Sequence, residues 1–273
     1  MQNTFWKNLL IVAALTALPN TATSETDPIT NSKLQLGVTF VRVQSNGCVA
    51  SLWASGRFSD DWIIRAAEGH ISGNIEKPQI TTPLMIAVAR NKIDDLDTIL
   101  DRGGDPDATN GVGCSALLWS ISMGREEIFD RLIEAGADVS QPDAAGRTPL
   151  MVAAKKGSVR MAEELIRLGA DVNKSQNGGI NEVGETALMK AAWRPQNAAM
   201  LELLVGKGAD PNATNKHGKT ALMMAAIAGN LENARFLVES GAEVSKSSND
   251  GSTAIDYAKS SIQSDVVRYL SGL

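Results

Sequence analysis

Thr148-Pro149-Leu150-Met151-Val152-Ala153-Ala154 decides the fold, because related stretches recur along the chain at a nearly constant spacing. The equivalent stretches begin at Thr82, Ser115, Thr186, Thr220 and Thr253, so successive starts lie 33, 33, 38, 34 and 33 residues apart. A second motif, Gly-Ala-Asp in its commonest form, keeps the same spacing and begins at Gly103, Gly136, Gly169, Gly208 and Gly241. Two independent motifs with one period of about 33 residues indicate an array of structural repeats.

Each period has the pattern of two helices joined by a turn. Thr148 can cap the first helix with its side-chain oxygen, and Pro149 suits the first helical position. Ala153-Ala154 allows neighbouring helices to approach closely, and Gly157 turns the chain before apolar residues at helical spacing. Gly169 stands at the end of the second helix, where a left-handed residue is favoured.

The two motifs and their period resemble those of the ankyrin-repeat family, and the resemblance covers residues 82–273. It implies an all-α fold, an α-solenoid of ankyrin repeats in which helix-turn-helix units alternate with β-hairpin-like loops. We expect six clear repeats. Family members commonly carry His after Thr-Pro-Leu, whereas this chain has Met85, Leu118, Met151, Met189, Met223 and Asp256 there. We expect the methionines to fill space between repeats rather than to bind a soft metal ion.

Residues 1–24 have the layout of a secretory signal peptide. Lys7 precedes the apolar run Leu9–Leu18, Pro19 breaks the run, and small polar residues lead to Ser24. Ten apolar residues form a helix of about 15 Å, roughly half a bilayer core, which favours cleavage over a membrane anchor. We expect cleavage near Ser24, a periplasmic or secreted location, and no membrane segment afterwards. With the repeats, this layout resembles exported bacterial ankyrin-repeat proteins.

Between the signal peptide and the clear repeats, we expect an N-terminal arm at 25–46 and a divergent capping repeat at 47–81. The stretch Leu34–Val43 partly alternates in polarity, which is consistent with a short strand or an extended arm. Gly47–Trp53 matches Gly113–Trp119 in its small and apolar residues, two periods earlier. Terminal repeats of a solenoid are commonly atypical, since one face meets water.

The chain has two cysteines, Cys48 and Cys114. A pair of cysteines in an exported chain favours a disulfide. The alignment above separates the two by two repeats, about 20 Å, whereas a disulfide needs Cα atoms within about 7 Å. We therefore expect two free thiols in a monomer, although a shifted register would bring Cys48 closer.

The sequence offers little for catalysis or for nucleic-acid binding. The net charge is −5 with a pI near 5.2, and this balance disfavours binding to nucleic acid. His70 and His217 are the only histidines, and the chain has no Gly-x-Ser-x-Gly, Cys-x-x-Cys, His-Glu-x-x-His or phosphate-loop motif. We expect no catalytic residue, no metal site and no cofactor.

In the family that this chain resembles, partner contacts concentrate on a concave strip of hairpin tips and inner faces of first helices. By motif position, the strip here includes eight residues that we expect to point into solvent and to bind a partner: Arg90, Arg147, Lys155, Lys156, Trp193, Arg194, Lys216 and Lys219. Its excess of positive charge opposes the sign of the whole chain and predicts an acidic protein partner. The alternative is that Lys and Arg only keep an exposed surface soluble.

The fourth repeat departs from the others in two places. Five extra residues lie within Asn173–Asn181, which predicts a longer exposed loop, and Trp193-Arg194-Pro195 replaces the usual turn glycine. We interpret this repeat as a candidate contact point, with neutral drift as the alternative. The function predicted is a non-catalytic protein–protein interaction scaffold. The alternatives are a secreted effector that binds a host protein and a hydrolase that uses an unrecognised site at His217 or Asp250.

Overall fold

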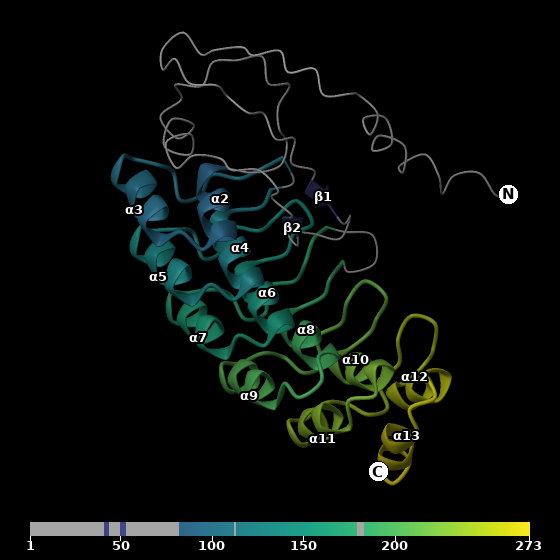
Figure 1. The fold of residues 1–273 in the computed structure, drawn as a ribbon. Helices are drawn as coiled ribbons and strands as arrows, with labels where there is room; N and C mark the ends of the chain where they lie inside the picture. The colour runs from purple at the N-terminus through teal and green to yellow at the C-terminus, as the bar shows by residue number, and fades with distance from the viewer. Residues whose placement is uncertain (1–40, 44–49, 53–81, 112, 179–182) are drawn as a thin grey trace, which may run out of the picture.

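The computed structural model describes residues 41–43, 50–52, 82–111, 113–178 and 183–273. From residue 82 onward these residues form twelve helices that pair into six successive helix-turn-helix units (Figure 1). The pairs are α2 (Pro83–Arg90) with α3 (Ile93–Asp101), α4 (Ala116–Met123) with α5 (Glu126–Glu134), α6 (Pro149–Lys156) with α7 (Val159–Arg167), α8 (Ala187–Trp193) with α9 (Ala198–Gly206), α10 (Ala221–Ala228) with α11 (Leu231–Glu239), and α12 (Ala254–Ser260) with α13 (Ser264–Leu270).

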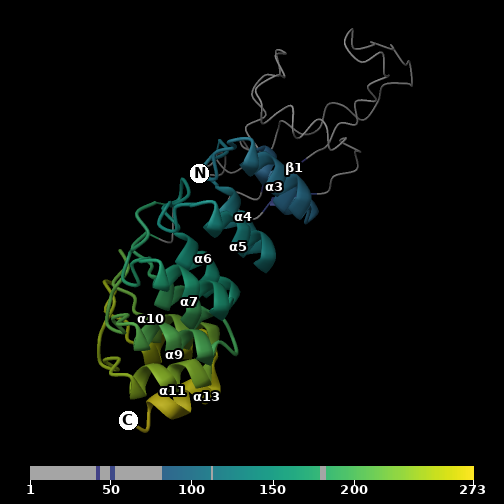
Figure 2. The same ribbon diagram turned by 90° about the vertical axis from the view of Figure 1, so that its left-hand side faces the viewer.

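The first helices of the pairs, from α2 to α12, form one row, and the second helices, from α3 to α13, form the other. Each first helix packs against the first helices of the neighbouring pairs and against its own second helix. The loops between pairs gather along one edge of the stack (Figure 2). This arrangement confirms the predicted all-α solenoid of six clear repeats.

Side-chain caps fix the start of the first helices. The Oγ1 atom of Thr148 accepts a 3.3 Å hydrogen bond from the backbone N–H of Met151. Thr82, Ser115, Thr186 and Thr220 cap their helices in the same way. At Thr253 the roles reverse, because Asp256 accepts bonds from its backbone N–H and its hydroxyl. The repeated Thr or Ser is therefore the N-cap residue of every first helix, and its hydroxyl oxygen accepts the capping bond in the first five units.

The core runs along the whole stack rather than forming one centre. Ala153 and Ala154 are fully buried, as expected for small residues where helices approach closely. Met85, Met151, Met189 and Met223 are at most 1% exposed, in the position where family members commonly have His. These methionines fill space between repeats, which confirms the packing expected for them.

A two-stranded antiparallel sheet precedes the solenoid in the chain. It consists of β1 (Val41–Val43), within the stretch Leu34–Val43, and β2 (Ala50–Leu52), with Val41 opposite Leu52. The alignment of Gly47–Trp53 with Gly113–Trp119 predicts a helix where β2 lies, and for these three residues it is wrong. The remainder of the expected capping repeat, 47–81, the signal peptide, 1–24, and most of the arm, 25–46, lie outside the described residues.

Cys114 is disulfide-bonded, so the expected free thiol at this position is wrong. That expectation used the distance between Cys48 and Cys114 that follows from the alignment of Gly47–Trp53 with Gly113–Trp119. The strand β2 contradicts this alignment. The chain's other cysteine, Cys48, lies outside the described residues. No helix among the described residues is long and apolar enough to cross a bilayer.

Candidate protein-binding site

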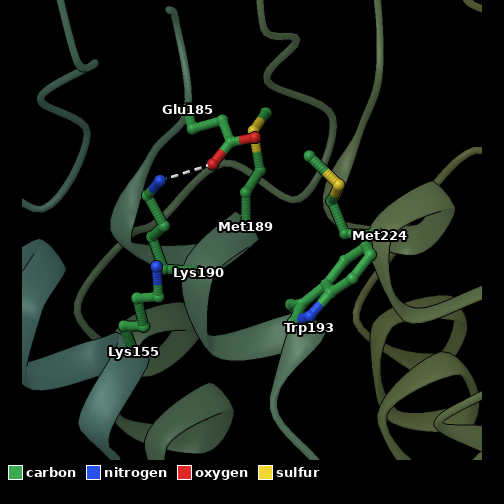
Figure 3. A pocket seen from close by; sticks show the side chains of 6 residues that line it. All are labelled: Lys155, Glu185, Met189, Lys190, Trp193 and Met224. Atoms are coloured by element: carbon green, nitrogen blue, oxygen red, sulfur yellow. Dashed lines mark hydrogen bonds and ion pairs between the residues drawn. The ribbon is translucent and has the colours of Figure 1, made fainter. Parts of the chain in front are cut away.

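A pocket of about 200 Å³ opens on the row of first helices, across the third, fourth and fifth repeats. Its walls come from α6, α8, α10 and the residue just before α8's cap (Figure 3). The lining residues are Lys155, Glu185, Met189, Lys190, Trp193 and Met224. Two of the predicted strip residues, Lys155 and Trp193, therefore lie at one site.

Trp193 forms the exposed wall of this pocket. It is the last residue of α8, and half of its surface is exposed. The turn that follows has four residues, 194–197, against two in most of the other repeats, and Gln196 takes the left-handed conformation at φ 53°. Side-chain amides from the next repeat hold this turn: Asn230 donates to the carbonyl of Trp193 (2.9 Å) and Asn233 to that of Arg194 (2.7 Å). The indole is thus presented from a fixed backbone rather than from a mobile loop.

The opposite side of the pocket carries a buried ion pair. The Nζ atom of Lys190 lies 2.5 Å from Oε2 of Glu185, and both residues are at most 9% exposed. The neighbouring repeats have Val152 and Met224 at the position of Lys190. Sequence reasoning missed this pair, although a lysine at an otherwise apolar helix position was a usable signal.

The hairpin that contains the five-residue insertion closes at Glu185, a residue of the pocket. In the third repeat the hairpin closes between Asp143 and Arg147, whereas in the fourth it closes between Gln176 and Glu185, where Gln176 N–H donates to the Glu185 carbonyl (2.9 Å). The extra residues therefore lie between these two. Gln176 is almost fully buried, so the expectation of an exposed loop throughout is wrong at this residue, and 179–182 lie outside the described residues. Glu185, which closes the hairpin that contains the insertion, and Trp193, which precedes the altered turn, both line this pocket.

Exposed cations lie next to the lining residues in the chain and in the neighbouring hairpin tip. Lys155 and Lys156 end α6, and Arg194 follows Trp193 directly. Lys216 lies in the hairpin tip of the next repeat, where its backbone bonds to Val183 on one side and to Asn249 on the other. We refer to Lys155, Lys156, Trp193, Arg194 and Lys216 as the Trp193 face.

Three of the predicted strip residues are placed differently. Arg147 is 5% exposed, so the expectation that it points into solvent is wrong: its guanidinium pairs with Asp143 of the same hairpin, with Nε 2.7 Å from Oδ2. Lys219 is half-buried, with its ammonium 4.5 Å from the centre of the Tyr257 ring, a cation–π contact. Arg90 is half-buried on α2, far along the stack from the pocket.

Among the described residues, no group of His, Cys, Asp and Glu is arranged to hold a metal ion. His217 is exposed in a hairpin tip, where its backbone N–H donates to Asn215 (2.9 Å) and its carbonyl accepts from Asn249 (2.9 Å). The first bond lies within the hairpin tip, and the second joins this tip to the next one.

A family model described as ankyrin repeats (3 copies) matches residues 84–176, 143–215 and 188–272. The chain belongs to the ankyrin-repeat family. Members of this family are typically non-catalytic, and their repeats imply protein partners.

Known relatives of this ankyrin-repeat chain match only part of it. Ankyrin repeat and SOCS box protein 6 of Homo sapiens is 42% identical over 69 residues, which are 23% of this chain and 16% of the relative. Ankyrin repeat and SAM domain-containing protein 6 of Rattus norvegicus is 42% identical over 78 residues, 28% of this chain and 9% of the relative. A transient receptor potential cation channel subfamily A member 1 homolog of Caenorhabditis elegans is 37% identical over 89 residues, which are 33% of this chain and 7% of the relative. The chain spans less than a fifth of the length of these relatives.

Proposed function

We propose that this ankyrin-repeat protein is an interaction scaffold that binds an acidic protein partner on the Trp193 face. One observation carries the proposal: a half-exposed tryptophan, Trp193, stands at the rim of a pocket among exposed cations. Trp and Arg are the residue types that dominate binding hot spots, and a hot spot commonly fills or borders a pocket.

The charges of the chain support a partner of negative charge. The chain has a net charge of −5, yet Lys155, Lys156, Arg194 and Lys216 are all exposed, and Lys155 lines the pocket. A basic face on an acidic protein attracts an oppositely charged partner, and this attraction acts mainly on the association rate. Charge reversal on this face should therefore slow association, whereas loss of Trp193 should speed dissociation.

Affinity capture with matched variants tests this function. Wild-type protein, the variant Lys155→Glu/Lys156→Glu/Trp193→Ala and the control Leu168→Ala/Lys207→Glu, which changes exposed residues at the ends of second helices, are each immobilised. We expect acidic proteins that the wild type and the control retain equally and that the triple variant loses. Retention of the same proteins by the triple variant would show that partners bind elsewhere.

We further propose that the protein is exported to the periplasm and cleaved near Ser24. The support is the signal-like layout of 1–24 with Lys7 and the apolar run Leu9–Leu18. N-terminal sequencing of protein from the envelope of a Gram-negative host should give a start near Glu25. Recovery of the envelope protein with Met1 intact would contradict cleavage.

A further inference from the structure

The fourth repeat's hairpin contains an exposed Asn-Gly pair, Asn177-Gly178. Asn177 directly follows Gln176, whose N–H closes the hairpin on the Glu185 carbonyl (2.9 Å). Among the described residues, no hydrogen bond holds the side-chain amide of Asn177. An asparagine is chemically least stable when glycine follows it, because glycine has no side chain to keep its backbone nitrogen away from the asparagine amide.

The contact with the third repeat's hairpin orients this pair. A Cβ atom placed on Gly146 would collide with Oδ1 of Asn177 and would lie 3.0 Å from the backbone nitrogen of Gly178. The side-chain amide of Asn177 and the nitrogen that follows it therefore lie on the same side of the chain, the side that faces Gly146. Attack of this nitrogen on the amide thus needs no reversal of the side chain.

A second Asn-Gly pair, Asn110-Gly111, lies in the second repeat's hairpin and provides an internal comparison. Oδ1 of Asn110 accepts a 3.0 Å hydrogen bond from the N–H of Cys114, and the N–H of Asn110 donates to the Cys114 carbonyl (3.0 Å). Asn110 is also half-buried. Its amide is fixed as part of the hairpin, so attack by the Gly111 nitrogen must first break a hydrogen bond that Asn177 does not make.

We propose that Asn177 is a site of spontaneous deamidation in the folded protein. The backbone nitrogen of Gly178 attacks Cγ of Asn177, the new N–Cγ bond replaces the bond from Cγ to Nδ2, and the side-chain nitrogen leaves as ammonia with the amide proton of Gly178. Water then opens the cyclic imide at either of its carbonyls and leaves aspartate or isoaspartate. The reaction consumes water, needs no enzyme or cofactor, and adds a negative charge.

Isoaspartate at this position disturbs the contact between the third and fourth hairpins, since the main chain gains a methylene group. A Cβ atom on Gly178 would lie 2.9 Å from the carbonyl carbon and oxygen of Ala145, and one on Gly146 would lie 2.8 Å from the backbone nitrogen of Asn177. These contacts leave no room for an added group, so the two hairpins must shift apart. The stability of a solenoid depends on contacts between neighbouring repeats, and the product is therefore less stable than the original chain.

Tryptic mapping of the full chain after incubation in mildly alkaline buffer tests the site, because base promotes loss of the amide proton. Asn177 lies in the peptide Ser175–Lys190, where fragment masses separate it from Asn181, and Asn110 lies in Gly103–Arg125. In the folded protein we expect the carboxylate to form about tenfold faster at Asn177, since a hydrogen bond slows the step at Asn110. In urea-denatured protein the two sites should react at similar rates. Equal rates in the folded protein, or no product at Asn177, would overturn the proposal.

Asn177→Gln separates deamidation from other effects of ageing, because the longer side chain forms the cyclic imide much less readily. Aged wild-type protein should unfold at a lower urea concentration than fresh wild-type protein. The aged variant should unfold at the same urea concentration as the fresh variant. Aged wild-type protein that carries isoaspartate at 177 and unfolds like the fresh protein would overturn the loosened contact between the hairpins.

Discussion

The ammonium of Lys190 donates a 2.5 Å hydrogen bond to Oε2 of Glu185, and the two residues are 5% and 9% exposed. Removal of one partner from such a pair leaves a buried charge without compensation, whereas replacement of both by neutral groups costs little. The neighbouring repeats have Val152 and Met224 at the position of Lys190, so an apolar side chain fits the space. The stability of the fold therefore does not require an ion pair at this position, and its place in the wall of the pocket is the better explanation for it.

Lys190→Met alone should lower the free energy of unfolding by about 3 kcal/mol, because Glu185 loses its partner. The double variant Glu185→Gln/Lys190→Met should recover most of that loss. Urea unfolding of the single and double variants gives the coupling energy directly. A single variant as stable as the wild type would show that solvent already compensates Glu185.

The fold was predictable because its signals are local and repeated. The cap at Thr148, the turn at Gly157 and the helix end at Gly169 each follow from residue type and spacing, and the structure has all three. The alignment of Gly47–Trp53 had one short match and no Gly-Ala-Asp motif after it. It therefore lacked the second, independent signal that supports the first five clear repeats, and β2 contradicts it.

The site was predictable only where backbone position decides exposure. Lys155 and Trp193 occupy the same position at the ends of successive first helices, and both are exposed on one face. Arg147 and Glu185 also share one motif position, but each is buried by an ion pair with a residue four or five positions away. Repeat spacing does not reveal such pairings, because they depend on which side chains happen to be complementary within one repeat.

The carboxylate of Asp250 should make the free energy of unfolding depend on pH in the acid range. The Ser248 hydroxyl (2.6 Å), the Ser252 N–H (3.0 Å) and the Tyr257 hydroxyl (3.0 Å) donate to its carboxylate and hold the pKa of Asp250 well below its usual range. A depressed folded-state pKa contributes stability above the unfolded-state pKa of about 3.9, and this contribution is lost as the pH falls toward the folded-state pKa.

Asp250→Asn should therefore reduce the loss of unfolding free energy between about pH 4 and pH 2, and should lower stability at pH 7. Urea unfolding over a pH series measures both effects. Asp101→Asn, an exposed residue at the end of α3, is the control. An unchanged pH slope in Asp250→Asn would mean that the three hydrogen bonds do not persist in solution.

The disulfide at Cys114 predicts a clear labelling result. Cys114 is 1% exposed, and the chain has two cysteines. The denatured, unreduced monomer should take up no alkylating reagent, and after reduction it should take up two per chain, as measured by intact mass. Loss of a native disulfide typically costs about 2–5 kcal/mol, so Cys114→Ser should lower the unfolding free energy by that order. Alkylation without reduction would contradict the bond.

Two asparagine side chains bridge successive repeats, just after the second helices of the third and fourth repeats. The Nδ2 group of Asn173 donates to the Gly208 carbonyl (2.9 Å), and its Oδ1 accepts from the N–H of Asp210 (2.9 Å). Asn212 makes the same two bonds to the fifth repeat's Gly241 and Glu243. Ser140 occupies this position in the second repeat, where its side chain is too short to reach both groups.

Ser140→Asn should supply this bridge between the second and third repeats and raise the unfolding free energy by about 1 kcal/mol, since a net hydrogen bond contributes about 0.5–1.5 kcal/mol. The backbone is prepared for it: the Ser140 N–H bonds to Asp138 (2.8 Å) just as the Asn173 N–H bonds to Asp171 (2.9 Å). Asn173→Ser, the reverse exchange, should lower stability by about 1–2 kcal/mol. Urea unfolding of both variants measures the pair of effects. If Asn173→Ser destabilises while Ser140→Asn changes nothing, the bridge requires more of its local sequence than the asparagine alone.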